Sequence, residues 1–374
     1  MALEFLYTQP VKIRFGCGSR KELPAVLASL GADRALVVCD RFLRPAVEQM
    51  QREIPAIAAI FSDIEENPQL SGVTASVGLI RAYNVGAVIG IGGGSTMDTA
   101  KFAAAIATES DDPLPYFKGE RPFPASRLPM IAMPTTAGTG SEVTQVSVMS
   151  NGREKKTINN PVFMPTCAIV DPELTVTVPP RTTMNTGLDA MAHALEGYWS
   201  KNHQPISDLC AIEAVRLVLE NLETAYRDGS NMKARENMSL AALLGGMSFA
   251  LPKTAGSHAC SYPLSEDYHL PHGEACAFTL DSFVRINADE RLETLCRRVG
   301  LSGTDELAER IHALKVLGGL RTHLRDLGEV DLDKLCSDAA KHPLMQNNPV
   351  AMDAAALRRM FTALQGGGGS WTSA

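Results

Sequence analysis

Several classes of protein are excluded by what this 374-residue sequence lacks. No stretch reaches about 18 consecutive uncharged apolar residues, the length that a membrane-spanning helix requires, so we expect no membrane partner. The eight cysteines include no CxxC pair and predict neither a disulfide framework nor a thiolate zinc site; we expect buried free thiols. A net charge of −7 and a pI of about 5.7 argue against a nucleic-acid partner.

The N-terminus also lacks the pattern of a secretory signal. The segment MALEFLYTQPVKIRFG has no basic stretch followed by an apolar one, so we expect a cytoplasmic protein. The remaining composition, 45% hydrophobic and 21% charged, is that of a globular protein. At about 100–200 residues per domain, the chain is long enough for two domains. Small molecules are the expected partners.

The first half of the chain alternates apolar runs with amphipathic stretches. Runs rich in Val, Ile and Ala predict buried strands at 34–40, 85–95, 128–136 and 166–172. Helical patterns lie between them, for example at 41–52 and 71–83. This alternation is typical of a largely parallel, Rossmann-like sheet with helices on both faces.

The pattern changes after the proline pair Pro179–Pro180. Almost no strand signal follows, and helical patterns cover 187–200, 205–225, 232–250, 285–299, 304–325 and 353–364. We therefore predict an α/β domain over residues 1–178 and an all-helical domain over 179–365. The final GGGGSWTSA, residues 366–374, is typical of a flexible tail.

A phosphate-binding loop is indicated by AVIGIGGGSTMDTAK, residues 87–101. A buried strand ends there in three consecutive glycines, and a helix is expected to begin at Ser95 or Thr96. Glycines let the backbone approach a phosphate, and free N–H groups at a helix N-terminus favour an anion. Ser95 occupies the last glycine position of the GxGxxG fingerprint, so a tight strand-to-helix turn without a ligand is the alternative.

Two further loops follow predicted strands. Asp40 ends the strand RALVVCD, where a carboxylate could accept hydrogen bonds from ribose hydroxyls and would repel a 2′-phosphate; a plain helix cap is the alternative. The segment PTTAGTGSEVT, residues 134–144, is rich in hydroxyls and backbone donors. Loops at the carboxyl ends of strands in one open sheet would line a single ligand-binding crevice.

A metal site is suggested by an acid and a histidine in GLDAMAHALE, residues 187–196. Asp189 and His193 would project from the same helix face and could offer two ligands to one ion. His258 and His272, fourteen residues apart, are further candidates if separate elements bring them together. For each histidine alone, a hydrogen-bonded core or surface residue remains the alternative.

Taken together, these motifs resemble one family. GGGSTMDTAK, PTTAGTGSEVT, GLDAMAHALE and two histidines fourteen apart in a segment ending PHGEA occur in the order and spacing of the iron-containing (group III) alcohol dehydrogenases, which have the dehydroquinate synthase-like fold. The resemblance extends over residues 5–365 and includes ENPQL (66–70) and QNNPV (346–350). The context SHACSYPL is similar to a sub-branch associated with phosphonate metabolism.

The resemblance implies specific site residues. It assigns metal binding to Asp189, His193, His258 and His272. It assigns NAD contacts to Asp40, Asn67, Gly93, Gly94, Ser95, Asp98, Thr135, Thr136, Thr139, Thr144, Val148 and Lys156. Lys155 is the alternative to Lys156, because the loop length leaves the alignment open by one residue. In this family an acid at position 40 goes with a preference for NAD, in agreement with the charge argument.

One position departs from the family pattern. Many members carry another histidine four residues after the third metal ligand, beside the nicotinamide, and here that position is Tyr262. Tyr262 could donate a hydrogen bond to the substrate oxygen or shape the pocket, and His269 is an alternative proton relay. We therefore name Tyr262 and His269 as the candidate catalytic residues.

The resemblance implies a metal-dependent, NAD(P)-linked alcohol dehydrogenase or aldehyde reductase. The ion would act as a Lewis acid on the substrate oxygen while hydride passes to or from the nicotinamide. Three nitrogens and a carboxylate suit Fe(II) and Zn(II) alike, and the family favours iron. The expected substrate is a short alcohol or aldehyde, including anionic ones such as phosphonoacetaldehyde, and the expected assembly is a homodimer.

Three other functions compete with this one. A zinc glycerol-dehydrogenase-type polyol dehydrogenase shares the fold, but His193 argues against it. A carbocycle-forming lyase of the dehydroquinate synthase kind would need a basic phosphate pocket, whose motif we do not find. A nucleotide-binding sensor without turnover is the candidate from another class, and the complete Asp/His/His/His set disfavours it.

Overall fold

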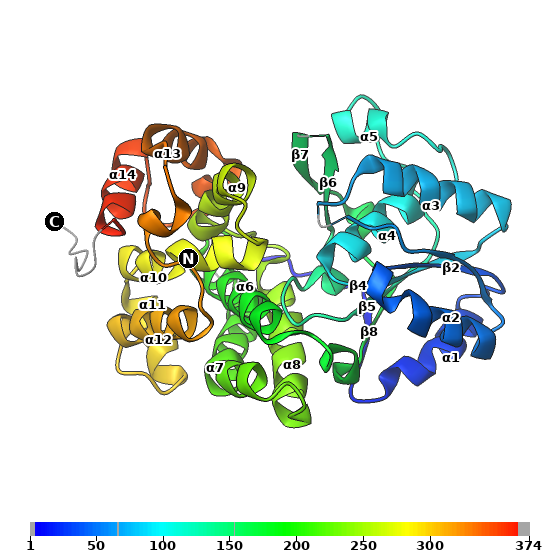
Figure 1. The fold of residues 1–374 in the computed structure, drawn as a ribbon, viewed down its shortest axis with the longest axis horizontal. Coiled ribbons are helices and arrows are strands. Elements are labelled where there is room, and N and C mark those ends of the chain that lie inside the picture. Colours follow the sequence, from blue (N-terminus) through cyan, green and yellow to red (C-terminus); the bar gives the residue numbers. More distant parts are fainter. Residues whose placement is uncertain (1–3, 66, 153, 366–374) are drawn as a thin grey trace. The chain divides into compact units, whose positions relative to one another are not determined.

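The computed structural model describes residues 4–65, 67–152 and 154–365, so the predicted tail at 366–374 lies outside the described residues. The chain forms two compact units (Figure 1). The α/β unit comprises Thr8–Thr136 and Gly140–Thr175, and the helical unit comprises the chain from Val176 on together with residues 4–7 and Ala137–Thr139. The short segment from Ala137 to Thr139 therefore groups with the helical unit, which the predicted ranges did not anticipate.

The α/β unit is built on a six-stranded sheet in which every pair of neighbouring strands is parallel. The strand order is β1-β8-β5-β4-β2-β3. Its strands are β1 (Lys12–Phe15), β2 (Ala35–Cys39), β3 (Ile57–Phe61), β4 (Ala87–Gly92), β5 (Met130–Pro134) and β8 (Cys167–Val170). After β3 the chain crosses to the other side of β2, so the order of winding reverses between β2 and β4. Open α/β sheets bind ligands outside the carboxyl ends of the strands at such a point.

Both faces of this sheet are covered, as the near-continuous apolar strands predict. Its helices are α1 (Leu23–Ser29), α2 (Arg44–Glu53), α3 (Leu70–Ala82), α4 (Gly94–Ile106) and α5 (Leu114–Lys118). Alternate residues of β2 face opposite ways: Leu36 and Val38 pack in one core with α3 and α4, whereas Val37 and Cys39 pack in another with α1 and α2. An antiparallel hairpin of β6 (Val146–Asn151) and β7 (Glu154–Asn159), not predicted from the sequence, completes the unit.

The helical unit contains no strand among its described residues, and the predicted fold class is confirmed. Its helices are α6 (Pro180–Trp199), α7 (Pro205–Arg227), α8 (Met232–Phe249), α9 (Gly256–Tyr268), α10 (His272–Ile286), α11 (Glu290–Arg298), α12 (Thr304–Leu317), α13 (Leu332–Lys341) and α14 (Ala354–Ala363). The prediction of one helix over 285–299 is wrong, because the backbone breaks between α10 and α11, where Asp289 caps α11 by accepting a hydrogen bond from the Leu292 N–H. Helices α9 and α13, and α10 up to residue 284, were not predicted.

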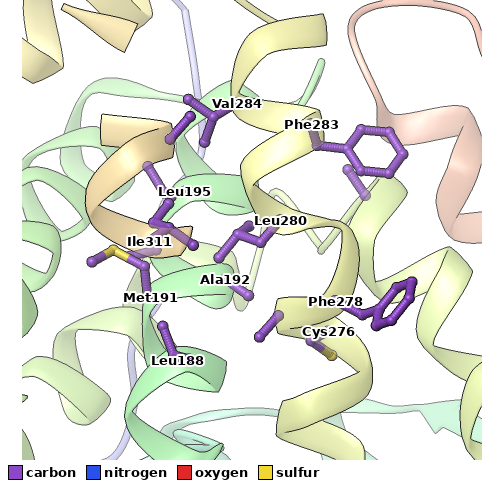
Figure 2. Close-up of a cluster of buried hydrophobic side chains, with 14 of the residues drawn as sticks. Leu188, Met191, Ala192, Leu195, Cys276, Phe278, Leu280, Phe283, Val284 and Ile311 are labelled. Carbon is purple, nitrogen blue, oxygen red and sulfur yellow. The ribbon is translucent and has the colours of Figure 1, made fainter. Parts of the chain in front are cut away.

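The core of the helical unit forms around α6, which is buried along most of its length. Figure 2 shows part of this core, where α6, α10 and α12 contribute Leu188, Met191, Leu195, Leu280, Val284 and Ile311. This packing fixes the helices that carry the candidate metal ligands. No helix among the described residues is long and apolar enough to cross a membrane.

Candidate metal and nucleotide sites

Helix α6 presents two candidate metal ligands on one buried face. Asp189 and His193 are four residues apart and both are buried. The distance from Asp189 Oδ1 to His193 Nδ1 is 3.9 Å. Side chains at i and i+4 lie on the same side of a helix, so the spacing read from the sequence gives the observed arrangement.

The other two candidates come from different helices. His258 lies in the first turn of α9, and its Nε2 is 3.1 Å from His193 Nε2 and 3.7 Å from Asp189 Oδ1. His272 is the first residue of α10, and its Nε2 is 3.9 Å from Asp189 Oδ1. The structure therefore brings all four predicted residues together within the helical unit.

Asp189, His258 and His272 fit a divalent ion: their donor atoms and Cys276 Sγ all lie within 4.8 Å of one another, whereas His193, the fourth predicted ligand, falls outside this group of described residues and lies beside His258. With bonds of about 2.0–2.1 Å, neighbouring donors around a tetrahedral ion lie roughly 3.3 Å apart. The donor separations of 3.1, 3.7 and 3.9 Å are close to that spacing. Asp189 Oδ1 is buried and has no hydrogen-bond partner among the described residues, a costly state that a cation would relieve. The His272 side chain is 44% exposed, so an ion can reach the cluster from solvent.

Hydrogen bonds at Nδ1 orient two of the imidazole rings. His193 Nδ1 lies 3.4 Å from the Gly138 carbonyl oxygen, and His258 Nδ1 pairs with the Glu196 carboxylate. A proton held on Nδ1 by these acceptors leaves the lone pair of Nε2 free to bind a metal. The two Nε2 atoms lie 3.1 Å apart.

The electrostatics of the cluster favour a cation. Burial and the neighbouring imidazoles of His258 and His272 lower the pKa of His193 well below its usual value, so this ring is neutral. Burial also opposes a charge on His258, but the hydrogen-bonded Glu196 carboxylate favours one and raises the pKa of His258. Two buried carboxylates, Asp189 and Glu196, lie beside these rings, and their charge favours a cation there.

Sequence reasoning missed two residues at this cluster. Glu196 follows Asp189 by seven positions, so the helical repeat already placed it on the same face of α6. Cys276 follows His272 by four on α10; its Sγ is 3.7 Å from His272 Nε2, and it borders the apolar core (Figure 2). Burial raises the pKa of the Cys276 thiol, which opposes formation of a metal-binding thiolate.

In the α/β unit, the loops after three neighbouring strands carry the predicted nucleotide-binding residues. Asp40 follows β2, Gly93 and Gly94 follow β4, and Thr135 and Thr136 follow β5. Because these strands are parallel neighbours in the sheet, the three loops meet at one edge, beside the point where the winding reverses.

Asp40 does not act as a simple helix cap, since its side chain makes no capping hydrogen bond. Its Oδ1 accepts a hydrogen bond of 2.6 Å from the Thr96 hydroxyl, and its Oδ2 lies 3.4 Å from the Gly93 nitrogen. The first turn of α4 has no side-chain cap, and the N-terminus of a helix favours an anion. A Cβ at Gly92 would approach Thr96 Oγ1 to 2.5 Å and Asp40 Oδ2 to 2.7 Å, so only glycine fits this turn.

Three further predicted contacts lie in a buried network next to α4. Asp98 accepts hydrogen bonds of 2.9 Å from both the Ser141 hydroxyl and the Val148 N–H. Lys101 donates to the hydroxyls of Ser141 at 2.7 Å and Thr144 at 3.4 Å. Burial raises the pKa of Asp98 and lowers that of Lys101 to about 8. This network fixes Asp98, Thr144 and Val148 relative to the glycine loop.

Lys155 and Lys156, between which the alignment leaves the cofactor contact open, lie in different surroundings. Lys155 Nζ lies 3.0 Å from Asn67 Oδ1, next to another predicted contact. Lys156 Nζ lies over the Phe117 ring, 4.8 Å from its centroid, and 2.9 Å from Glu154 Oε1. Successive residues of a strand point to opposite faces, so only Lys155 shares the face of Asn67. The geometry favours Lys155 as the cofactor contact.

The remaining predicted residues lie in diverse settings. Ser95 is in the first turn of α4, and Thr139 belongs to the helical unit. Tyr262 lies one turn after His258 on α9, and its ring stacks on His342 with centroids 4.1 Å apart. His269 is exposed in the left-handed conformation that ends α9, with φ 54°, which argues against a relay role.

Comparisons with known proteins agree over nearly the whole chain. Residues 10–172 match the family model described as iron-containing alcohol dehydrogenase, and residues 183–364 match that of the C-terminal region of the Fe-containing alcohol dehydrogenase family. The chain is 33% identical over 370 residues to long-chain-alcohol dehydrogenase 1 of Geobacillus thermodenitrificans, covering 93% of each protein. It is 35% identical over 345 residues to 1,3-propanediol dehydrogenase of Citrobacter freundii, covering 86% of this chain and 88% of that one.

Solved structures lead to the same family. The crystal structure of sulfoacetaldehyde reductase from Bifidobacterium kashiwanohense in complex with NAD+ is similar with a TM-score of 0.94 and 41% identity, over 98% of this chain and 100% of that one. A structure of 1,3-propanediol oxidoreductase is similar with a TM-score of 0.88 and 31% identity. The chain is therefore an oxidoreductase and belongs to the iron-containing alcohol dehydrogenase family.

Proposed function

We propose that this chain is a metal-dependent, NAD(H)-linked enzyme that interconverts a short-chain aldehyde and its alcohol. The observation that carries the proposal is the convergence of Asp189 Oδ1 with the Nε2 atoms of His258 and His272, beside His193. A divalent ion held by these residues would polarise the substrate oxygen, and NAD(H) would exchange hydride with the substrate carbon.

The residues of the α/β unit have distinct proposed roles toward the cofactor. Backbone N–H groups of Gly94 and Ser95 at the N-terminus of α4 bind the pyrophosphate. Asp40 accepts hydrogen bonds from the ribose hydroxyls and disfavours a 2′-phosphate. Lys155, held beside Asn67, takes the place that the sequence assigned to Lys156.

Within this class we propose a short anionic aldehyde as the substrate, either phosphonoacetaldehyde or its sulfonate counterpart. Two observations support this choice. The chain is 41% identical to a protein named sulfoacetaldehyde reductase. In addition, Tyr262 and its context SHACSYPL are similar to the sub-branch of the family associated with phosphonate metabolism. The similarity to 1,3-propanediol dehydrogenase makes a neutral diol the second candidate.

A substrate comparison tests this proposal. Metal-loaded protein is assayed by the loss of NADH absorbance with sulfoacetaldehyde, phosphonoacetaldehyde, acetaldehyde and 3-hydroxypropanal. We expect kcat/KM to be at least about tenfold higher for one of the two anionic aldehydes than for acetaldehyde, equivalent to about 1.4 kcal/mol of transition-state binding. Equal or better turnover of the neutral aldehydes would reject the anionic substrate while leaving the reaction class intact.

We further propose Fe(II) as the physiological metal. Chelation should abolish turnover. Mixed imidazole and carboxylate ligands accept both Fe(II) and Zn(II), so the preference for iron comes from the family, and Fe(II) added without oxygen should restore more activity than Zn(II). Full activity of metal-free protein would overturn the proposed site. The homodimer and the cytoplasmic location remain predictions; light scattering on purified protein tests the first.

A further inference from the structure

We propose that Glu196 is a positioning residue that holds His258 in the orientation and tautomer needed for metal binding. The inference rests on the metal site proposed above. Glu196 is completely buried on α6, on the helix face that carries Asp189 and His193. It does not bind the ion itself, because all of its hydrogen-bonding capacity is used by α9.

The Glu196 carboxylate accepts four hydrogen bonds, two on each oxygen. Oε1 accepts from the backbone N–H groups of Ser257 at 2.5 Å and His258 at 3.2 Å. Oε2 accepts from the Ala255 N–H at 3.0 Å and from His258 Nδ1 at 2.5 Å. A carboxylate offers about four lone-pair positions, so this group is fully occupied. Such complete pairing is what a buried charge requires.

Three of these bonds fix the start of α9. Helix N-termini carry unpaired N–H groups and partial positive charge, and α9 has no side-chain cap of its own, since its N-cap residue is Ala255. The carboxylate of Glu196 fills this role from a neighbouring helix. The backbone of His258 is therefore anchored to α6 by the same group that binds its ring, and α6 also carries two other ligands.

The fourth bond determines which nitrogen of His258 carries the proton. A carboxylate only accepts, so Nδ1 must donate and Nε2 keeps its lone pair. Nε2 is the atom that lies 3.7 Å from Asp189 Oδ1 and 3.1 Å from His193 Nε2. A glutamine at position 196 would keep the shape but offer one accepting oxygen instead of two. If its NH2 group faced Nδ1, the ring proton would move to Nε2 and block the ligand.

The test measures metal affinity rather than turnover. Metal-free wild type and the Glu196→Gln and Glu196→Asp variants are titrated with Co(II), whose visible spectrum reports coordination, and with Zn(II) in competition with a chromophoric chelator. We expect Glu196→Gln to bind either metal about 10–100-fold more weakly, the usual effect of losing a carboxylate partner of a ligating histidine. Glu196→Asp retains both accepting oxygens and should fall between wild type and Glu196→Gln.

Asp281→Asn is the matched control. Asp281 is a buried carboxylate on α10 that pairs with Lys315 at 2.7 Å; it follows the ligand His272 by nine positions, more than two helical turns. Its loss should lower the unfolding temperature but leave the metal affinity and the Co(II) spectrum unchanged. NADH binding, followed by fluorescence, should remain at the wild-type level in all variants.

Several outcomes would overturn the inference. If Glu196→Gln binds metal within twofold of the wild-type affinity, the Glu196 carboxylate does not orient His258 for metal binding. An equal loss of affinity in Asp281→Asn would reduce the effect to general destabilisation. If Glu196→Gln does not fold, Glu196→Asp decides alone: an affinity equal to that of wild type rejects the role. Wild-type protein that binds no metal would reject both this inference and the proposed metal site.

Discussion

Gly273 is the residue after His272, and its replacement by alanine tests whether helix packing sets the metal site. A Cβ at this position would lie 2.2 Å from the Asn185 carbonyl oxygen, 2.8 Å from the Asn185 carbonyl carbon and 3.3 Å from Asp189 Cβ. The first two distances involve backbone, which cannot rotate away. Restoring an ordinary contact of 3.4 Å requires α10 to move away from α6 by about 1 Å.

That displacement exceeds the tolerance of a metal site. Ligand distances are held to within about 0.2 Å of their preferred values, so moving His272 by about 1 Å removes it as a ligand. We expect Gly273→Ala to lower metal affinity at least about 10–100-fold, as disruption around a ligand typically does. Overpacking should also destabilise the metal-free protein by about 1–3 kcal/mol, which lowers Tm by roughly 2–10 °C.

Two measurements on the same preparation check this prediction. Metal affinity is obtained by competition with a chelator, and Tm of the metal-free protein by scanning fluorimetry. The control is Gly78→Ala in the middle of α3, where no atom lies within 4 Å of the added Cβ. It should leave metal affinity unchanged and stabilise the helix by up to about 1 kcal/mol. A Gly273→Ala variant that binds metal as well as wild type would refute the argument from packing.

Three further predictions concern single side chains. Burial raises the pKa of Glu142 from 4.5 to about 7, so its contribution to stability is complete below pH 4.5 and is lost as pH rises through 7. Between pH 5 and 8 the free energy of unfolding in urea should therefore fall by up to about 3 kcal/mol more in wild type than in Glu142→Gln. Parallel pH profiles of the two proteins would contradict this. Asp40→Asn can still accept a hydrogen bond from the Thr96 hydroxyl but lacks the charge that repels a 2′-phosphate. We expect it to lower the ratio of kcat/KM with NADH to kcat/KM with NADPH by at least about tenfold. An unchanged ratio would mean that other residues determine the choice of cofactor. His272→Ala, at a position where the side chain is 44% exposed, should abolish turnover. NADH binding, measured by fluorescence, should stay as in wild type. Retained turnover would reject this residue as a metal ligand.

The sheet was predictable because its strands are buried on both faces. Residues such as Val37, Val38 and Ile89 are completely buried, and such strands appear in the sequence as continuous apolar runs. The start of α6 was predicted seven residues late, because the proline pair was taken only as a break. Pro180 in fact begins the helix, where its fixed φ and missing N–H are favourable.

Helix α9 escaped prediction for a different physical reason. It is buried on nearly all sides in its first turns, so small and apolar residues surround it and no amphipathic repeat remains. Gly256 at its start and Pro263 inside it also oppose a helix prediction. His258 lies on α9 and His272 begins α10, so two separate helices bring them together. Their spacing in the sequence therefore could not predict that they share a metal site. Only Asp189 and His193 could be paired from helical spacing alone.

The substitution at position 262 has a structural consequence that no local pattern shows. The Tyr262 ring stacks on His342, eighty positions away in the sequence, with an interplanar angle of 28°. Burial and the nearby His258 lower the pKa of His342 to about 4, so its ring is neutral at pH 7. Its Nδ1 accepts a hydrogen bond of 3.3 Å from the Leu344 N–H, which leaves the ring proton on Nε2. At the position where many family members have a histidine, this chain therefore has a tyrosine stacked on a neutral imidazole. This pair carries no positive charge, so the charge of the proposed anionic substrate would have to be neutralised by other residues.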